Sequence, residues 1–85
     1  MPCRPDLDRF SRILERTCAQ ALHDYRAFPG EETWLRAAGR LDGILLGLHA
    51  LCRALDDQAQ GEEMFETARR IVEQAREELR RSQPG

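Results

Sequence analysis

The side chains best suited to chemistry in this sequence are two histidines, three cysteines and two acidic pairs. His23, Asp24 and Tyr25 follow one another directly. An acid–base or nucleophilic site needs such groups to converge, whereas neighbours on a helix point about 100° apart. These three residues therefore do not form a catalytic cluster, and we interpret His23 as a surface residue.

The spacing of the cysteines gives no metal site and no disulfide framework. Cys3, Cys18 and Cys52 are odd in number and form no C-x-x-C pair. They also lack zinc-finger spacing with His23 or His49. We interpret them as free thiols in a reducing cytosol, and Cys18 and Cys52 as small apolar residues on helix faces.

The acidic pairs and the known sequence motifs add no site. Asp56-Asp57 and Glu62-Glu63 flank a polar segment; a weak cation site is one alternative, but we interpret them as acidic residues at helix boundaries. No phosphate-binding loop, metalloprotease motif or nucleophile elbow occurs. We expect His49 to be partly buried and hydrogen-bonded. The sequence thus predicts a protein that is not an enzyme, with no cofactor, metal or small-molecule substrate.

Length and charge restrict the class of protein further. The chain has 85 residues, which is one small domain, and a net charge of −2, which does not indicate a polyanion binder. All thirteen basic residues are arginine, which suggests a GC-rich genome. We expect no signal peptide, and the longest apolar stretch, 43–52, is too short for a membrane span of roughly twenty residues. The expected location is the cytoplasm.

Apolar periodicity predicts three helices, over residues 6–27, 31–56 and 62–81, with flexible tails at 1–5 and 82–85. Asp6 is the expected N-cap of the first helix, and Pro29-Gly30 ends it. A loop at 58–61 separates the other two because the apolar phase is lost there; one long helix kinked at Gly61 is the alternative. The predicted fold is all-α, a three-helix antiparallel bundle completed by self-association, since so small a core supplies only a few kcal/mol.

The segment from Trp34 to Leu55 predicts one helix with two unlike faces. Its bulky seam follows alternating steps of four and three residues. Three interior glycines on the other side cost about 2.5–3 kcal/mol relative to alanine. We therefore predict a close-packing face against another helix or a second subunit; breakage of the helix at a glycine is the alternative. The seam is Trp34, Ala38, Leu41, Leu45, Leu48, Cys52 and Leu55, widened by Ala37, Ile44 and Leu51, and the predicted face is Gly39, Gly43, Gly47, Ala50 and Ala54.

Three large side chains of this segment are candidate anchors for a partner. Trp34 is of the residue type most enriched at interface hot spots, although at the start of the seam it also suits the core. Leu35 and Leu46 fall off the seam, on the flank that faces away from it. Nucleic acid is a weaker alternative partner. Three arginines could form a basic cluster for it, Arg26, Arg36 and Arg40, but the acidic residues Glu31, Glu32 and Asp42 stand nearby.

The stretch WLRAAGRLDGI, from Trp34 to Ile44, resembles a pattern in small helical proteins encoded by tailed phages and prophages. In that pattern a Trp precedes a Gly-Arg-hydrophobic triplet, and a leucine-rich helix follows. This chain departs from it by two further glycines and a third amphipathic helix. The resemblance implies a role in virion assembly or in binding a host protein.

These observations together predict a non-enzymatic interaction or assembly protein, a structural or accessory component of a phage or prophage, located in the cytoplasm or the virion. A small regulator or inhibitor of one host protein is the alternative, and a nucleic-acid-binding regulator is the weaker one. The expected partner is a second copy of the chain, in a homodimer or a higher homo-oligomer, or one other protein. No membrane is expected to take part.

Overall fold

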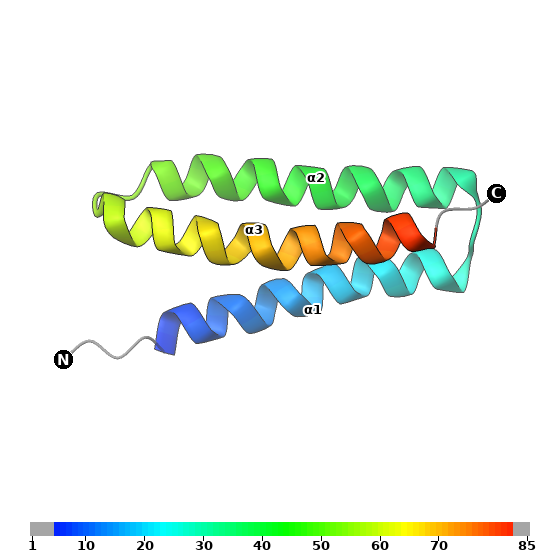
Figure 1. Cartoon of the computed structure of the whole chain (residues 1–85), viewed down its shortest axis with the longest axis horizontal. Coiled ribbons are helices and arrows are strands. Elements are labelled where there is room, and N and C mark those ends of the chain that lie inside the picture. The colour runs from blue at the N-terminus through cyan, green and yellow to red at the C-terminus, as the bar shows by residue number, and fades with distance from the viewer. Residues whose placement is uncertain (1–4, 83–85) are drawn as a thin grey trace.

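The computed structural model describes residues 5–82, which form three long helices joined by short turns (Figure 1). They are α1 (Pro5–Ala27), α2 (Glu31–Arg53) and α3 (Gln58–Arg81). Each helix runs antiparallel to the one before it (Figure 1), and no strand occurs in the described range. The prediction of an all-α three-helix bundle is confirmed.

The start of α1 differs from the prediction. The helix begins at Pro5, so Asp6 lies inside it rather than at its N-cap. Proline suits the first helical position, because its missing N–H would have no partner there. The rest of the predicted N-terminal tail, with Cys3, lies outside the described residues. At the other end, the predicted tail begins at Ser82, which is the C-cap of α3.

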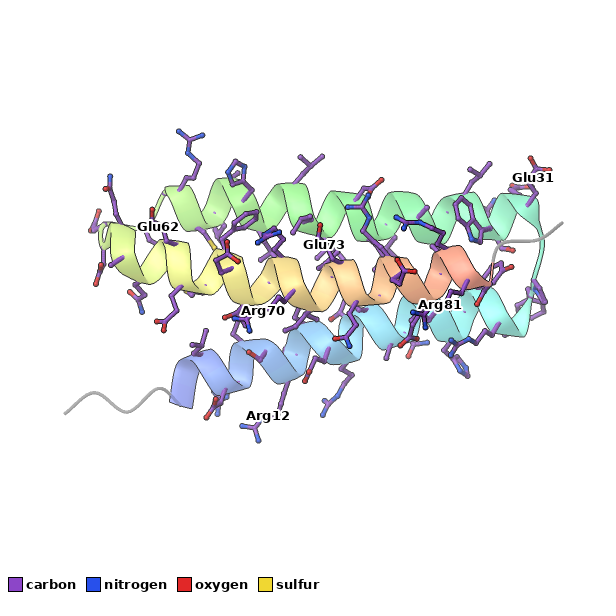
Figure 2. All side chains as sticks on the ribbon, viewed as in Figure 1. Arg12, Glu31, Glu62, Arg70, Glu73 and Arg81 are labelled. Carbon is purple, nitrogen blue, oxygen red and sulfur yellow. The ribbon has the colours of Figure 1, made fainter. Side chains whose placement is uncertain are left out.

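The core lies where the apolar faces of all three helices meet. Leu41 of α2 and Val72 of α3 are 0 % exposed, and Leu79 is 2 % exposed. Charged side chains such as Arg12 and Glu31 lie outside the bundle (Figure 2), and no described polar or charged residue is buried. The buried cluster is Leu14, Cys18, Ala21, Leu22, Tyr25, Ala37, Leu41, Ala68, Val72, Ala75 and Leu79.

The predicted seam of α2 faces this core. Trp34, Ala38, Leu45 and Leu48 are partly buried against the cluster, as predicted. Leu51, which was expected to widen the seam, is instead 61 % exposed. Of the three residues predicted to widen the seam, Ala37 is buried and Ile44 is partly buried against the core, so the prediction is wrong only at Leu51, in the last turn of the helix.

The turn between α2 and α3 lies earlier than the sequence predicts. The second helix ends at Arg53 rather than at residue 56, and α3 begins at Gln58 rather than at residue 62. The Asp57 side chain accepts a hydrogen bond from the backbone N–H of Gln60 at 3.1 Å, which satisfies one of the free donors at the helix start. The segment 58–61 is therefore the first turn of α3. Neither a loop there nor one long kinked helix is correct.

Gly61 explains how this polar turn can pack against α2. The residue is buried, and a Cβ added to it would overlap the carbonyl oxygen of Cys52. The absence of a side chain therefore lets the first turn of α3 lie directly against the last turn of α2. Among the described glycines, Gly61 is the one that packs against the backbone of another helix, whereas the sequence predicts that it lies in a loop.

Two aromatic side chains fix the opposite end of α3. The hydroxyl of Tyr25 donates to the backbone oxygen of Ser82 at 2.7 Å, and the indole N–H of Trp34 donates to that of Leu79 at 2.9 Å. The last carbonyls of a helix have no partner within the helix, so these bonds tie α1 and α2 to the end of α3. Trp34 is thus part of the fold of its own chain.

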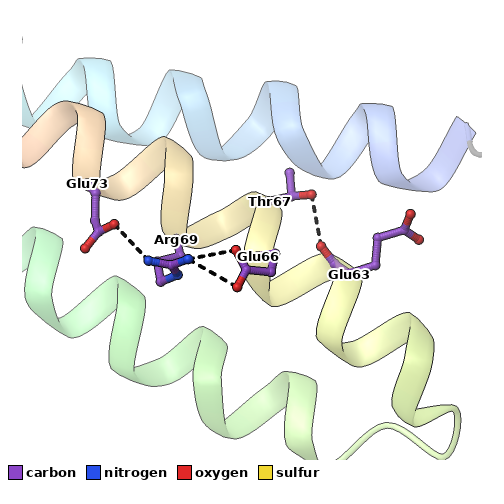
Figure 3. A network of polar contacts seen from close by, with 5 residues as sticks. All are labelled: Glu63, Glu66, Thr67, Arg69 and Glu73. Atoms are coloured by element: carbon purple, nitrogen blue, oxygen red, sulfur yellow. Dashed lines mark hydrogen bonds and ion pairs between the residues drawn. The ribbon is translucent and has the colours of Figure 1, made fainter.

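Ion pairs between side chains three and four residues apart line the exposed surface of α3. The guanidinium of Arg69 lies 2.9 Å from Glu66 and 3.3 Å from Glu73 (Figure 3). The same figure shows Thr67 bonded to the backbone oxygen of Glu63. Such exposed pairs contribute at most about 1 kcal/mol each.

Candidate functional site

The residues that resemble a catalytic cluster on paper point in different directions. His23 is exposed, and the Tyr25 hydroxyl is engaged by Ser82. The carboxylate of Asp24 accepts hydrogen bonds from Gln20 at 2.9 Å and from Arg40 at 3.1 Å. These two bonds, the Gln20 one above all, hold the pKa of Asp24 below its usual value. The three side chains have separate structural partners and do not meet.

His49 lies on the surface rather than in a partly buried, hydrogen-bonded position. Its ring packs against Phe65 of α3, with ring centroids 4.8 Å apart. The two rings line an open groove of about 410 Å³ beside Cys52 and Gly61. In the described range no three His, Cys, Asp or Glu residues come together in a group that could hold a metal ion.

The two described cysteines are buried and free of disulfides. Cys18 is 3 % exposed and Cys52 is 5 % exposed. Burial raises the pKa of both thiols, and at Cys18 the positive charge of Arg40 opposes this only in part. A raised pKa keeps a thiol protonated at neutral pH, whereas nucleophilic attack and metal binding need the thiolate. Both residues therefore serve packing.

The predicted small-residue face lies on the outer side of α2, where no other helix covers it. We define the outer face of α2 as six exposed, uncharged residues on this side of the helix. Apart from the adjacent residues and the nearby backbone of α2 itself, no described atom lies within 4 Å of a Cβ added at any of its three glycines. The helix is continuous through all of them, so the alternative of a break is wrong. The outer face of α2 consists of Leu35, Gly39, Gly43, Leu46, Gly47 and Ala50.

The remaining residues predicted to contact a partner differ in how far they are exposed. Ala54 is exposed but lies beyond the helix end, as the C-cap of α2. Trp34 points inward, so it is not an exposed anchor. Leu35 and Leu46 are 57 % and 71 % exposed, and each therefore presents a large apolar side chain to solvent. Their role in binding remains a prediction.

Two of the charges next to the outer face of α2 are bound to the other two helices. Arg40 lies 3.1 Å from Asp24 of α1, and Asp42 lies 3.3 Å from Arg76 of α3. These two are the charged residues between Gly39 and Ala50 in the sequence. Both side chains are held towards the flanks of α2, so residues 43–50 contain no Asp, Glu or Arg. Nearer the start of the helix, exposed Arg36 lies on the same side and is paired with Glu32 at 2.7 Å. A mainly apolar, exposed helix face suits contact with another protein surface.

The arginines considered for nucleic-acid binding are each paired with an acid. Arg26 lies 3.4 Å from Glu78, and Arg36 lies 2.7 Å from Glu32. With Arg40 bound to Asp24, they form no free basic cluster. Unpaired basic charge lies elsewhere, on the outer side of α1, where Arg12 points away from the bundle (Figure 2). Three exposed arginines there make no ion pair with any described residue: Arg9, Arg12 and Arg16.

Two further results bear on the class of protein. No helix in the described part of the chain is both long enough and apolar enough to cross a membrane. Comparisons with protein families, with curated proteins and with solved structures give no match to this chain.

Proposed function

We propose that this chain is a non-enzymatic interaction or assembly protein whose contact surface is the outer face of α2. The observation that carries the proposal is one exposed strip of a continuous helix, with three glycines above which the described residues leave open space and two leucines exposed to solvent. Glycine inside a helix costs about 0.8–1 kcal/mol relative to alanine. A surface that approaches the helix closely would give these glycines a function.

The partner we favour is a second copy of the chain. Two-fold homodimers are the commonest assemblies and use the same patch on both subunits. With 23 residues, α2 offers a face about 34 Å long and about 10 Å wide. This footprint is smaller than the roughly 800 Å² that each partner buries in a standard interface. The expected dimer is therefore weak and concentration-dependent.

A regulator or inhibitor of one host protein would use the same face for a different partner. The resemblance of residues 34–44 to small phage-encoded proteins motivates both this alternative and the assembly role. A structural subunit would associate with itself, whereas a regulator would bind its target with one defined stoichiometry.

A second candidate function is contact with nucleic acid through α1. Three arginines stand about one turn apart on the outer side of this helix: Arg9, Arg12 and Arg16. None of them has an acidic partner among the described residues. Binding through them would be sequence-independent and would weaken steeply with salt. Fluorescence anisotropy with a labelled duplex at low salt tests this, and the absence of any binding there would dismiss it.

Sedimentation equilibrium over a wide concentration range tests the principal proposal. Wild-type protein should pass from monomer to dimer in the micromolar range. Leu46→Glu should abolish this transition, because it places a charge in the middle of the strip. Ile13→Glu is the matched control, since Ile13 is 55 % exposed on α1 and away from the strip. A monomer at every concentration would overturn the proposal.

A further inference from the structure

We infer that two copies of the chain pack through the outer faces of α2 in an antiparallel arrangement, with a two-fold axis between Asp42 and Gly43. The inference rests on the proposed function, and it adds the orientation and register of the contact. In this register, two residues lie opposite each other when their numbers add up to 85. Side-chain size and the charges at the ends of α2 both favour this arrangement over the parallel one.

Side-chain size favours the antiparallel register at Leu46 and Gly39. The Leu46 side chain is 71 % exposed, and the space above Gly39 is empty to at least 4 Å from an added Cβ. In the antiparallel register Leu46 of one copy lies over the bare backbone at Gly39 of the other. Two-fold symmetry makes this contact twice. A parallel pair would instead set Leu46 against Leu46 and leave the glycine spaces unfilled.

The charges at the two ends of α2 also favour the antiparallel register. Glu32 stands in the first turn, where it lies 2.7 Å from Arg36 of its own helix, and Arg53 stands in the last turn. Both are exposed, and 32 and 53 add up to 85, so each Glu32 faces the Arg53 of the other copy. A parallel pair would bring together two Glu32 carboxylates at one end and two Arg53 guanidinium groups at the other. Antiparallel packing also places the positive end of each helix dipole beside the negative end of its neighbour.

The charge closest to the proposed axis is already neutralised. Two copies of Asp42 would approach each other across the axis and repel. Each Asp42 carboxylate, however, lies 3.3 Å from Arg76 of its own α3 and stands on the flank of α2. Arg40, on the other flank, is held by Asp24 at 3.1 Å. These ion pairs leave the centre of the contact to Gly43 and its apolar neighbours.

Disulfide trapping tests the orientation. Gly39→Cys and Leu46→Cys are made separately in a Cys3→Ser background, mixed in equal amounts and oxidised gently, and mass spectrometry identifies the linked peptides. A disulfide requires Cα atoms within about 7 Å, so only facing positions link. The mixed 39–46 product should predominate, and Gly43→Cys, close to the axis, should link to itself. Predominance of the 39–39 and 46–46 products would overturn the antiparallel arrangement.

Charge reversal provides an independent readout by sedimentation. Glu32→Arg and Arg53→Glu should each raise the dissociation constant about 2- to 5-fold, as expected for an exposed ion pair. The double variant should bring the constant back towards the wild-type value. A double variant weaker than both single variants would contradict the Glu32–Arg53 contact. Circular dichroism of every variant shows that the monomer still folds.

These results separate the inference from the proposed function. A wild-type chain that never dimerises overturns both. A wild-type chain that dimerises but links like positions overturns the antiparallel arrangement alone, and self-association through α2 remains.

Discussion

Gly61 in the first turn of α3 packs directly against the carbonyl of Cys52 in the last turn of α2, with no room for a side chain between them. The three glycines on the outer face of α2 are in the opposite situation, because open space lies above each of them. The same residue type therefore has two roles in one small chain. At Gly61 it allows two helices to meet, and on α2 it leaves helix backbone uncovered.

Replacing Gly61 with alanine should destabilise the protein. The added methyl group overlaps the Cys52 carbonyl oxygen, which belongs to a helix backbone and cannot swing aside as a side chain can. Overpacking of this kind costs about 1–3 kcal/mol. Urea denaturation followed by circular dichroism measures the loss. A Gly61→Ala variant as stable as wild type would show that the α2–α3 turn is loosely packed.

Gly43→Ala is the matched substitution, and it should have the opposite sign. Apart from the adjacent residues and the nearby backbone of α2, the new methyl group meets no described atom within 4 Å. Alanine is favoured over glycine inside a helix by roughly 0.8–1 kcal/mol. The free energy of unfolding should rise by about that amount when measured at concentrations low enough to keep the chain monomeric. A decrease would mean that this part of α2 is not a regular exposed helix.

Removing the hydroxyl group of Tyr25 should loosen the C-terminal end of α3. Tyr25→Phe keeps the buried ring and loses only the 2.7 Å bond to the Ser82 oxygen, at a cost of about 0.5–1.5 kcal/mol. Hydrogen exchange should accelerate in the last turn of α3. Phe28→Ala is the control, because Phe28 is 75 % exposed and its loss should change stability by less than about 0.5 kcal/mol. If the hydrogen-exchange rates of Tyr25→Phe equal those of wild type, the Tyr25–Ser82 hydrogen bond does not stabilise the end of α3.

Cys18 and Cys52 should resist thiol reagents in the folded protein. Burial raises the pKa of both thiols, so the reactive thiolate is scarce at neutral pH, and the rate should keep rising at pH values above the usual thiol pKa. The experiment uses a Cys3→Ser variant and a colorimetric disulfide reagent. Both thiols should react at once in denaturant. Equally fast reaction of the native protein at neutral pH would show that these residues are accessible.

The helices and the core could be predicted from the sequence because both depend on local periodicity. Spacings of three and four residues placed Leu41 and Leu48 on the inner side of α2, where the structure has them. The start of α3 could not be predicted in this way. It depends on the Asp57 cap and on Gly61, neither of which contributes to an apolar pattern.

The structural role of each glycine could not be predicted from local periodicity either. Whether a glycine meets a neighbouring backbone is decided by how two helices pack, and the sequence of one helix does not contain that information. For this reason the sequence predicts close packing at Gly43 but gives no sign of it at Gly61. Trp34 shows the same limit, because its helical position suited both a core residue and an exposed anchor.

The most direct test of the proposed surface is a dilution series of ¹⁵N-labelled wild-type protein followed by amide NMR spectra. Self-association through the outer face of α2 predicts that the Gly39, Gly43 and Gly47 signals shift progressively with concentration. Gly61 is the internal reference and should not move, because it is buried on the other side of α2. Spectra that are identical at all concentrations, or shifts confined to α1 and α3, would contradict the proposal.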